Sequence, residues 1–127
     1  MKRHYKDLIV WQRAVRFVSL VYQATQQFPR DEQFGLTSQI RRAAVSIPSN
    51  IAEGQGRLTK GEFRQFLGHA KGSLLELETQ LLISQNLGYL QNLESLLEAL
   101  AEIARLLNGL LTSSQSRQPS LSNTGND

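Results

Sequence analysis

The residues that could hold a metal in this 127-residue chain are few and poorly spaced for that chemistry. A two-metal site between helices needs inward-facing Glu residues and a Glu-x-x-His pair on each of two helices. The chain has two histidines, His4 and His69, and neither follows a carboxylate residue by three positions. The spacing therefore predicts no metal site.

Nucleophilic and phosphate-binding patterns are missing as well. Cysteine does not occur, and no serine lies in a Gly-x-Ser-x-Gly turn. The pair Gly54 and Gly56 lacks the preceding strand and the full glycine pattern of a phosphate loop. We therefore expect a protein that is not an enzyme and that uses no cofactor.

Basic residues are the functional groups that the sequence distributes most unevenly. Residues 1–75 hold 12 Lys and Arg against 5 Asp and Glu, whereas residues 76–127 hold 2 against 6. Such asymmetry indicates either an anionic partner or charge matching between subunits, and the charge pattern alone leaves both alternatives open.

Polar side chains also interrupt an apolar stretch later in the chain. Glu76 and Glu78 lie within SLLELETQL, where leucines already fill the core-facing positions. One prediction is that these carboxylates pair with Arg41 or Arg42 of a neighbouring helix. The alternative is that they lie on a solvated helix face, as most charged residues do.

A second polar pair lies in the stretch around which the chain is organised, residues 39–57. Its apolar residues recur at helical spacing, and Pro48 falls inside that helix: Ile40, Ala44, Ile47 and Ile51 form the stripe. Asn50 and Glu53 follow the proline. We expect both to form structural hydrogen bonds with the backbone near Pro48, which lacks an N–H donor.

The elements that must position these residues are four helices. Apolar periodicity and turn residues place them at about 7–28, 36–55, 60–87 and 92–111, and the short joins between them favour antiparallel neighbours. Residues 112–127 have no periodicity and are predicted to be a disordered polar tail. The fold class is therefore all-α, an antiparallel up-down four-helix bundle over residues 1–111.

The first helix carries two apolar stripes, which is more than an ordinary surface helix needs. One stripe runs through Leu8, Trp11, Val15, Val18 and Tyr22, and the other includes Val10, Ala14, Phe17 and Val21. We predict that the second of these stripes forms an oligomer interface. The alternative is a helix buried on two sides in its own core.

The third helix begins with a strong local signal. Thr59 and Glu62 have the spacing of a capping box, and Leu58 and Phe63 have that of a hydrophobic staple.

Two glycines further along the third helix form a small pair on one face. Gly68 and Gly72 each cost about 1 kcal/mol in a helix relative to alanine. We therefore expect that close packing against another helix offsets this cost.

Two segments carry a family resemblance, IPSNIAEGQGR and, from Glu62 to Leu90, EFRQFLGHAKGSLLELETQLLISQNLGYL. They closely resemble the four-helix-bundle family encoded in bacterial 23S rRNA intervening sequences, over about residues 5–111. The resemblance implies up-down protomers assembled into rings of five, with no enzymatic activity. A more distant similarity is to the accessory protein of diversity-generating retroelements, which works beside a reverse transcriptase.

Bundle topology gives the basic residues a location. In an up-down bundle the chain start, the join between helices two and three, and the end of helix four share one end. This arrangement brings together six basic residues: Lys2, Arg3, Lys6, Arg57, Lys60 and Arg64. The opposite end holds Arg30 with Asp31, Glu32 and Glu94.

These observations lead to two function hypotheses. The first is a homo-oligomeric protein, a pentamer by resemblance, whose basic end binds RNA or DNA with low sequence specificity. The second is a protein-docking accessory subunit, for example of a retroelement reverse transcriptase. No segment has the length and apolarity of a membrane span or of a secretory signal, so a cytoplasmic protein without membrane contact is expected.

Overall fold

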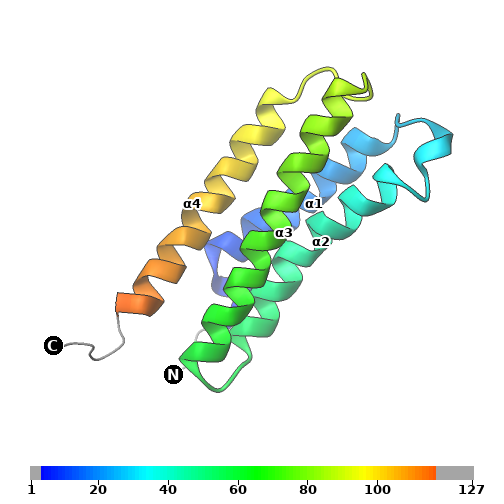
Figure 1. The fold of residues 1–127 in the computed structure, drawn as a ribbon. Coiled ribbons are helices and arrows are strands. Elements are labelled where there is room, and N and C mark those ends of the chain that lie inside the picture. Colours follow the sequence, from blue (N-terminus) through cyan, green and yellow to red (C-terminus); the bar gives the residue numbers. More distant parts are fainter. Residues whose placement is uncertain (1–3, 117–127) are drawn as a thin grey trace, which may run out of the picture.

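The computed structural model describes residues 4–116, and this part of the chain is helical with no strand (Figure 1). Its four long helices are α1 (Ile9–Thr25), α2 (Leu36–Gln55), α3 (Lys60–Asn86) and α4 (Glu94–Ser116). Two short 3-10 helices precede them, η1 (Tyr5–Asp7) before α1 and η2 (Arg30–Glu32) before α2. The all-α prediction with four helices is confirmed.

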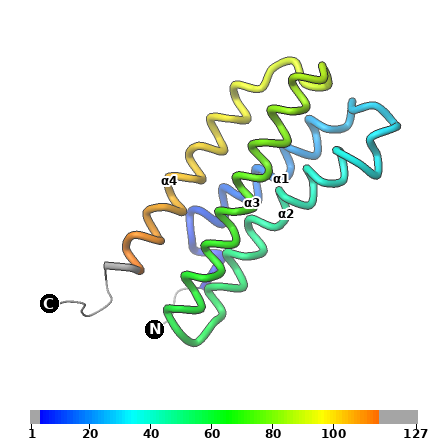
Figure 2. The backbone as a smooth tube through the Cα atoms, viewed as in Figure 1, coloured from blue at the N-terminus to red at the C-terminus, as the bar shows by residue number. Residues whose placement is uncertain are grey.

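Each long helix packs against the next one in sequence, and α4 returns to pack against α1. Within residues 4–116 the diagonal pairs α1–α3 and α2–α4 make no backbone contact. Figure 2 shows the chain running up α1, down α2, up α3 and down α4. The first turn of α1 with η1, the α2–α3 turn and the end of α4 therefore lie toward the same end of the molecule.

The core runs along the bundle axis and takes one apolar stripe from each helix. Phe17 of α1, Ile47 of α2, Leu77 of α3 and Ile103 of α4 are almost fully buried. Burial of such a side chain contributes about 1.5–3 kcal/mol, so these stripes hold the four helices together. A partly exposed ion pair between Arg13 and Glu102 also joins α1 to α4.

The predicted oligomer-interface stripe of α1 belongs to this core. Val10, Ala14, Phe17 and Val21 are each at most 3% exposed within the single chain. The interface prediction for these four residues is wrong, because α2 and α4 already cover their side chains. The other stripe of α1 is buried only at Leu8. Its remaining residues are half-buried or exposed: Trp11, Val15, Val18 and Tyr22.

The glycine that packs closely between α2 and α3 is Gly54, not Gly68 or Gly72 as predicted. A Cβ atom on Gly54 would lie 2.8 Å from the Cβ of Phe66, so only glycine fits there without a shift. By contrast, Gly68 and Gly72 are exposed, and a Cβ on either would meet no atom within 4 Å. The expectation of close packing at Gly68 and Gly72 is therefore not met within the chain.

The hydrogen bond predicted to cap the start of α3 is present, but the predicted hydrophobic staple is not formed. The hydroxyl of Thr59 accepts a hydrogen bond of 3.1 Å from the backbone N–H of Glu62, and it also contacts the Glu62 carboxylate at 3.3 Å. Leu58, however, is 94% exposed, so it does not pack as the staple requires. The cap alone fixes where α3 begins.

The helix boundaries differ from the prediction mainly at the ends. The first helix begins at Ile9 because η1 precedes it, and α3 ends before Gly88, which takes a φ of 82°. The helix α4 continues to Ser116, so the predicted tail is wrong for residues 112–116. The remainder of that tail, residues 117–127, lies outside the described residues, as do residues 1–3. None of the helices described here is apolar over a length sufficient to cross a membrane.

Candidate nucleic-acid interface

The basic end of the bundle is formed by η1, the α2–α3 turn and the first turns of α3. Lys6, Arg57 and Lys60 are exposed there, and Arg64 is half-buried. Two further predicted members, Lys2 and Arg3, lie outside the described residues. The prediction that these segments converge is confirmed by one cavity, lined by Leu8, Gln55 and Lys60 together with Leu110 and Ser114 of α4.

Three carboxylates accompany these cations. Asp7, Glu53 and Glu62 are all exposed at the same end. Four described cations against three carboxylates leave a formal charge of about +1, whereas Arg30 with Asp31, Glu32 and Glu94 gives about −2 at the opposite end. The molecule is therefore electrically polar along its axis, although the charge of a single basic end is small.

One cation of the basic end, Arg57, contacts an aromatic ring that was not predicted to lie at this end. The guanidinium carbon of Arg57 lies 4.6 Å from the ring centroid of Phe66. The Phe66 ring in turn meets His69 edge to face, with centroids 5.8 Å apart. The i, i+3 spacing of Phe66 and His69 was a signal for this contact. The Arg57 contact was not readable, because it depends on how the turn folds back.

Arg64 is positioned differently from the other cations. Its Nε atom is buried and has no hydrogen-bond partner among the described residues, while the side chain as a whole is half-exposed. Burial of part of the guanidinium limits the directions in which its remaining N–H groups can point.

Two hollows flank the start of α3. One has a volume of about 380 Å³ and the other about 410 Å³, and Lys60 and Phe63 line both. The second hollow also includes Arg57 and the exposed Leu58. The basic end thus combines positive charge with uncovered apolar surface.

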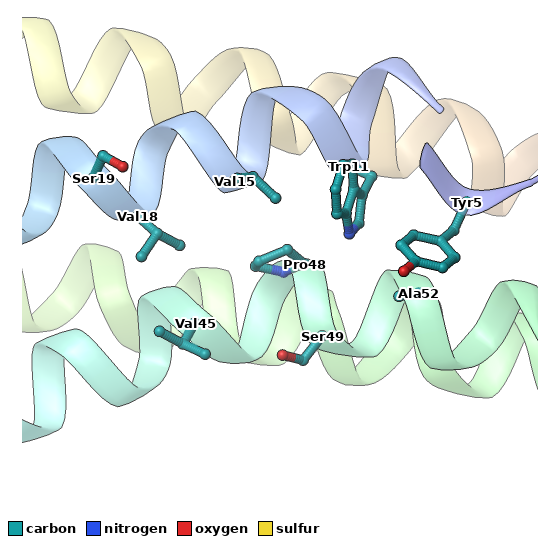
Figure 3. Close-up of a pocket in the computed structure, with 9 residues that line it drawn as sticks. All are labelled: Tyr5, Trp11, Val15, Val18, Ser19, Val45, Pro48, Ser49 and Ala52. Carbon is teal, nitrogen blue, oxygen red and sulfur yellow. The ribbon is translucent and has the colours of Figure 1, made fainter. Parts of the chain in front are cut away.

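A separate apolar groove of about 400 Å³ lies between α1 and α2 (Figure 3). Side chains from both helices point into it, and the ring of Tyr5 meets that of Trp11 at 5.2 Å at one end. Val15 and Val45, on its two sides, are 39% and 41% exposed. We call this surface the α1–α2 groove; its other lining residues include Val18, Pro48 and Ala52.

Of the two hydrogen-bond predictions beside Pro48, the one for Asn50 is confirmed and the one for Glu53 is wrong. The side-chain amide of Asn50 donates a 2.8 Å hydrogen bond to the backbone carbonyl of Ser46 and another of 2.9 Å to its hydroxyl. Ser46 also shares a hydrogen bond with Ser73 of α3. Glu53 is exposed, and its carboxylate forms no hydrogen bond with any other described residue.

The predicted pairing of Glu76 and Glu78 with Arg41 or Arg42 is not found among the described residues. Arg41 instead donates to the hydroxyl of Thr25 at 2.8 Å, which turns it toward α1.

Glu76 is exposed, as the alternative interpretation expected, and accepts a hydrogen bond from Gln80 at 3.2 Å. Glu78 is half-buried. Arg42 and Glu76 line one surface hollow without meeting as an ion pair in the described chain.

At the opposite end, Glu32 joins the two loops. Its carboxylate accepts a 3.0 Å hydrogen bond from the backbone N–H of Leu36 and another of 3.0 Å from the hydroxyl of Tyr89. The bond to Glu32, with burial and the charges of Glu32 and Asp31, raises the pKa of Tyr89 above its ordinary value of 10.0. This cluster is a structural link between the α1–α2 and α3–α4 connections.

The histidines occupy unrelated positions. His4 accepts a hydrogen bond from the backbone N–H of Lys6 at the start of η1, and His69 is exposed on α3. Within residues 4–116, no group of three or more His, Cys, Asp or Glu side chains has the arrangement to hold a metal ion.

A family model described as 23S rRNA-intervening sequence protein matches residues 6–109, which span α1, α2, α3 and most of α4. No curated protein matches the chain.

Proposed function

The chain belongs to the 23S rRNA-intervening sequence protein family, and from this premise we propose that it is a non-enzymatic homo-oligomer whose basic end binds nucleic acid with low sequence specificity. The observation that carries the proposal is the convergence of η1, the α2–α3 turn and α3, which gathers Lys6, Arg57, Lys60 and Arg64 at one end. Cations so placed contact phosphates without reading bases, so the affinity would depend on salt rather than on sequence.

Assembly is part of the proposal because one protomer offers few phosphate contacts. A ring would repeat the basic end in every subunit, and the family resemblance implies five. Linking several weak sites raises the overall affinity by orders of magnitude when one strand can reach them together. The family name, which refers to intervening sequences of 23S rRNA, agrees with an RNA ligand.

The α1–α2 groove is the surface that we assign to assembly. Its exposed Val15 and Val45, with Trp11 beside them, form a continuous apolar surface on the outside of the bundle (Figure 3). Contiguous apolar surface of this kind on a small protein usually marks a protein-protein contact. The groove therefore replaces the buried stripe of α1 as the candidate interface.

A protein-docking role is the second candidate, and a specific observation favours it. Leu58 is 94% exposed at the basic end, and the outer face of α3 exposes Leu75, Leu82 and Ile83. These side chains are outside the α1–α2 groove and would be available to another protein, such as a reverse transcriptase. This role needs no phosphate contact.

Mass photometry with and without RNA tests the proposal. The full chain at low micromolar concentration should give one species of several protomer masses, and a structured RNA added at low salt should increase that mass. A protein that remains a monomer would contradict the assembly. An oligomer whose mass does not change with RNA or DNA at any salt concentration would favour the docking role instead.

A further inference from the structure

Three side chains at the basic end form a continuous row. Arg57 lies over the ring of Phe66, with its guanidinium carbon 4.6 Å from the centroid, and Phe66 meets His69 with an interplanar angle of 85°. Phe66 and His69 are neighbours on one face of α3, because residues three apart on a helix lie side by side. We call Arg57, Phe66 and His69 the stacking row.

The middle of the row is fixed by the tightest contact between α2 and α3. Gly54 brings the α2 backbone against Phe66, where an added Cβ would be 2.8 Å away, and Phe66 is half-buried as a result. Arg57 and His69, at the two ends of the row, are exposed. The row therefore has an anchored centre and two planar groups at the surface.

Planar groups held in this way match a nucleobase. Single-stranded RNA and DNA are bound by stacking their bases on aromatic rings or on guanidinium planes, and every base has a face that can stack. Bases inside a duplex are already stacked on each other. Lys60 and Arg64 lie six and two residues before Phe66, so these cations and the row share the first turns of α3.

We infer that the stacking row binds unpaired bases, so that the ligand of the basic end is single-stranded nucleic acid. This inference rests on the proposed function, because it assumes that the basic end binds nucleic acid. It adds a contact to the bases that charge alone would not provide. Stacking is tolerant of sequence, which agrees with the low specificity proposed above.

The test compares probes that differ only in their bases. Fluorescence anisotropy of the full chain is measured with a labelled single strand of about 12 nucleotides, within the usual range of single-strand site sizes, and with an abasic strand of equal length. The two strands carry the same number of phosphates. We expect the base-bearing strand to bind about tenfold more tightly than the abasic one, as stacking of even one base would provide.

Matched variants assign that preference to the row. Arg57→Lys keeps the positive charge and removes the planar group, and Phe66→Leu keeps an apolar side chain at the helix contact. Both should reduce the preference for the base-bearing strand to about twofold or less, chiefly by weakening binding of the base-bearing strand. Arg30→Lys, at the opposite end, should keep the full preference. A circular-dichroism melt of each variant verifies that the helices are intact.

The outcomes separate the two levels of the proposal. Equal affinity of the parent protein for the base-bearing and abasic strands would overturn the stacking row and leave phosphate binding in place. A preference that survives in both Arg57→Lys and Phe66→Leu would overturn it too. Binding of neither strand, at any salt concentration, would overturn the proposed function together with this inference.

Discussion

Single residues hold the ends of this bundle in place through a few hydrogen bonds. Thr59 caps α3 at the basic end, and Glu32 joins Leu36 to Tyr89 at the opposite end. Next to Pro48, whose ring removes one helical donor, Asn50 adds a side-chain hydrogen bond to the Ser46 carbonyl. The sequence predicts the first and the last of these roles from local spacing. The link between Glu32 and Tyr89 spans 57 residues and cannot be read locally.

The Thr59 cap gives the first prediction. Thr59→Ala leaves the N–H of Glu62 without its hydroxyl partner, so it should lower the free energy of unfolding by about 1 kcal/mol. The melting temperature should fall by about 4 °C, with the fold retained. Thr79→Ala, on the exposed middle of α3, is the matched control and should change little. Equal melting temperatures for the Thr59 variant and the parent would mean that the cap does not stabilise α3.

Tyr89 gives a prediction about alkaline stability. Its pKa is raised in the folded state, chiefly by the bond to Glu32, so above pH 10 the unfolded chain loses this proton first. The stabilising contribution is therefore complete below pH 10 and is lost as the pH rises through the folded-state pKa.

Urea unfolding between pH 8 and pH 11 measures this effect. The unfolding free energy of the parent should fall more steeply above pH 10 than that of Tyr89→Phe. Tyr5→Phe, whose hydroxyl is not bonded to Glu32, should follow the parent. Parallel curves for the parent and Tyr89→Phe would show that the bond does not control this titration.

At the level of helices, apolar periodicity predicts the positions of the four helices well. It predicts less well which face of each helix is buried. The capping box and the turn glycines locate α2 and α3 within one residue, because those signals are local. The two apolar stripes of α1 are equally periodic, and choosing between them requires knowing which helices flank it. The same limitation explains Gly68 and Gly72, which share the composition of a close-packing pair without facing a helix of the same chain.

Three of the helical glycines provide a prediction at this scale. Gly54→Ala places a methyl group 2.8 Å from the Cβ of Phe66, so the hairpin must open and the protein should lose about 1–3 kcal/mol. Gly68→Ala and Gly72→Ala meet nothing within 4 Å and should each gain up to about 1 kcal/mol from helix propensity. Thermal melts measure all three. Destabilisation by Gly68→Ala or Gly72→Ala would instead mark the outer face of α3 as a contact between subunits.

At the scale of the whole molecule, antiparallel packing produces the electrical polarity that the sequence predicts. Short joins force the helices to alternate, so the basic segments meet at one end and Asp31, Glu32 and Glu94 lie at the other. The balancing carboxylates Asp7, Glu53 and Glu62 lie in the same segments as the cations, so the same topology places them at the basic end. The Arg57–Phe66 contact depends on how the turn folds back. For this reason the location and the charge of the candidate site were predictable, whereas its aromatic members were not.

Assembly through the α1–α2 groove is tested by a pair of substitutions. Val15→Asp and Val45→Asp place a charge at exposed positions of the groove, so they should dissociate the oligomer and leave the helical content unchanged. Gln23→Glu, an exposed polar position on α1, is the control. Light scattering measures whether the oligomer dissociates, and circular dichroism measures whether the helices remain folded. Charged substitutions at buried Phe17 or Val21 should unfold the protomer instead.

The most direct test of the central claim, that the basic end binds nucleic acid, is a salt series on one triple variant. Fluorescence anisotropy with a labelled RNA is measured for the parent, for Arg57, Lys60 and Arg64 all changed to Ala, and for Arg30→Ala as control. Each lost phosphate contact should flatten the slope of log affinity against log salt by about 0.7–0.9, and the loss of affinity should be equal for unrelated sequences. Arg30→Ala should match the parent. Equal slopes for the triple variant and the parent would contradict the claim.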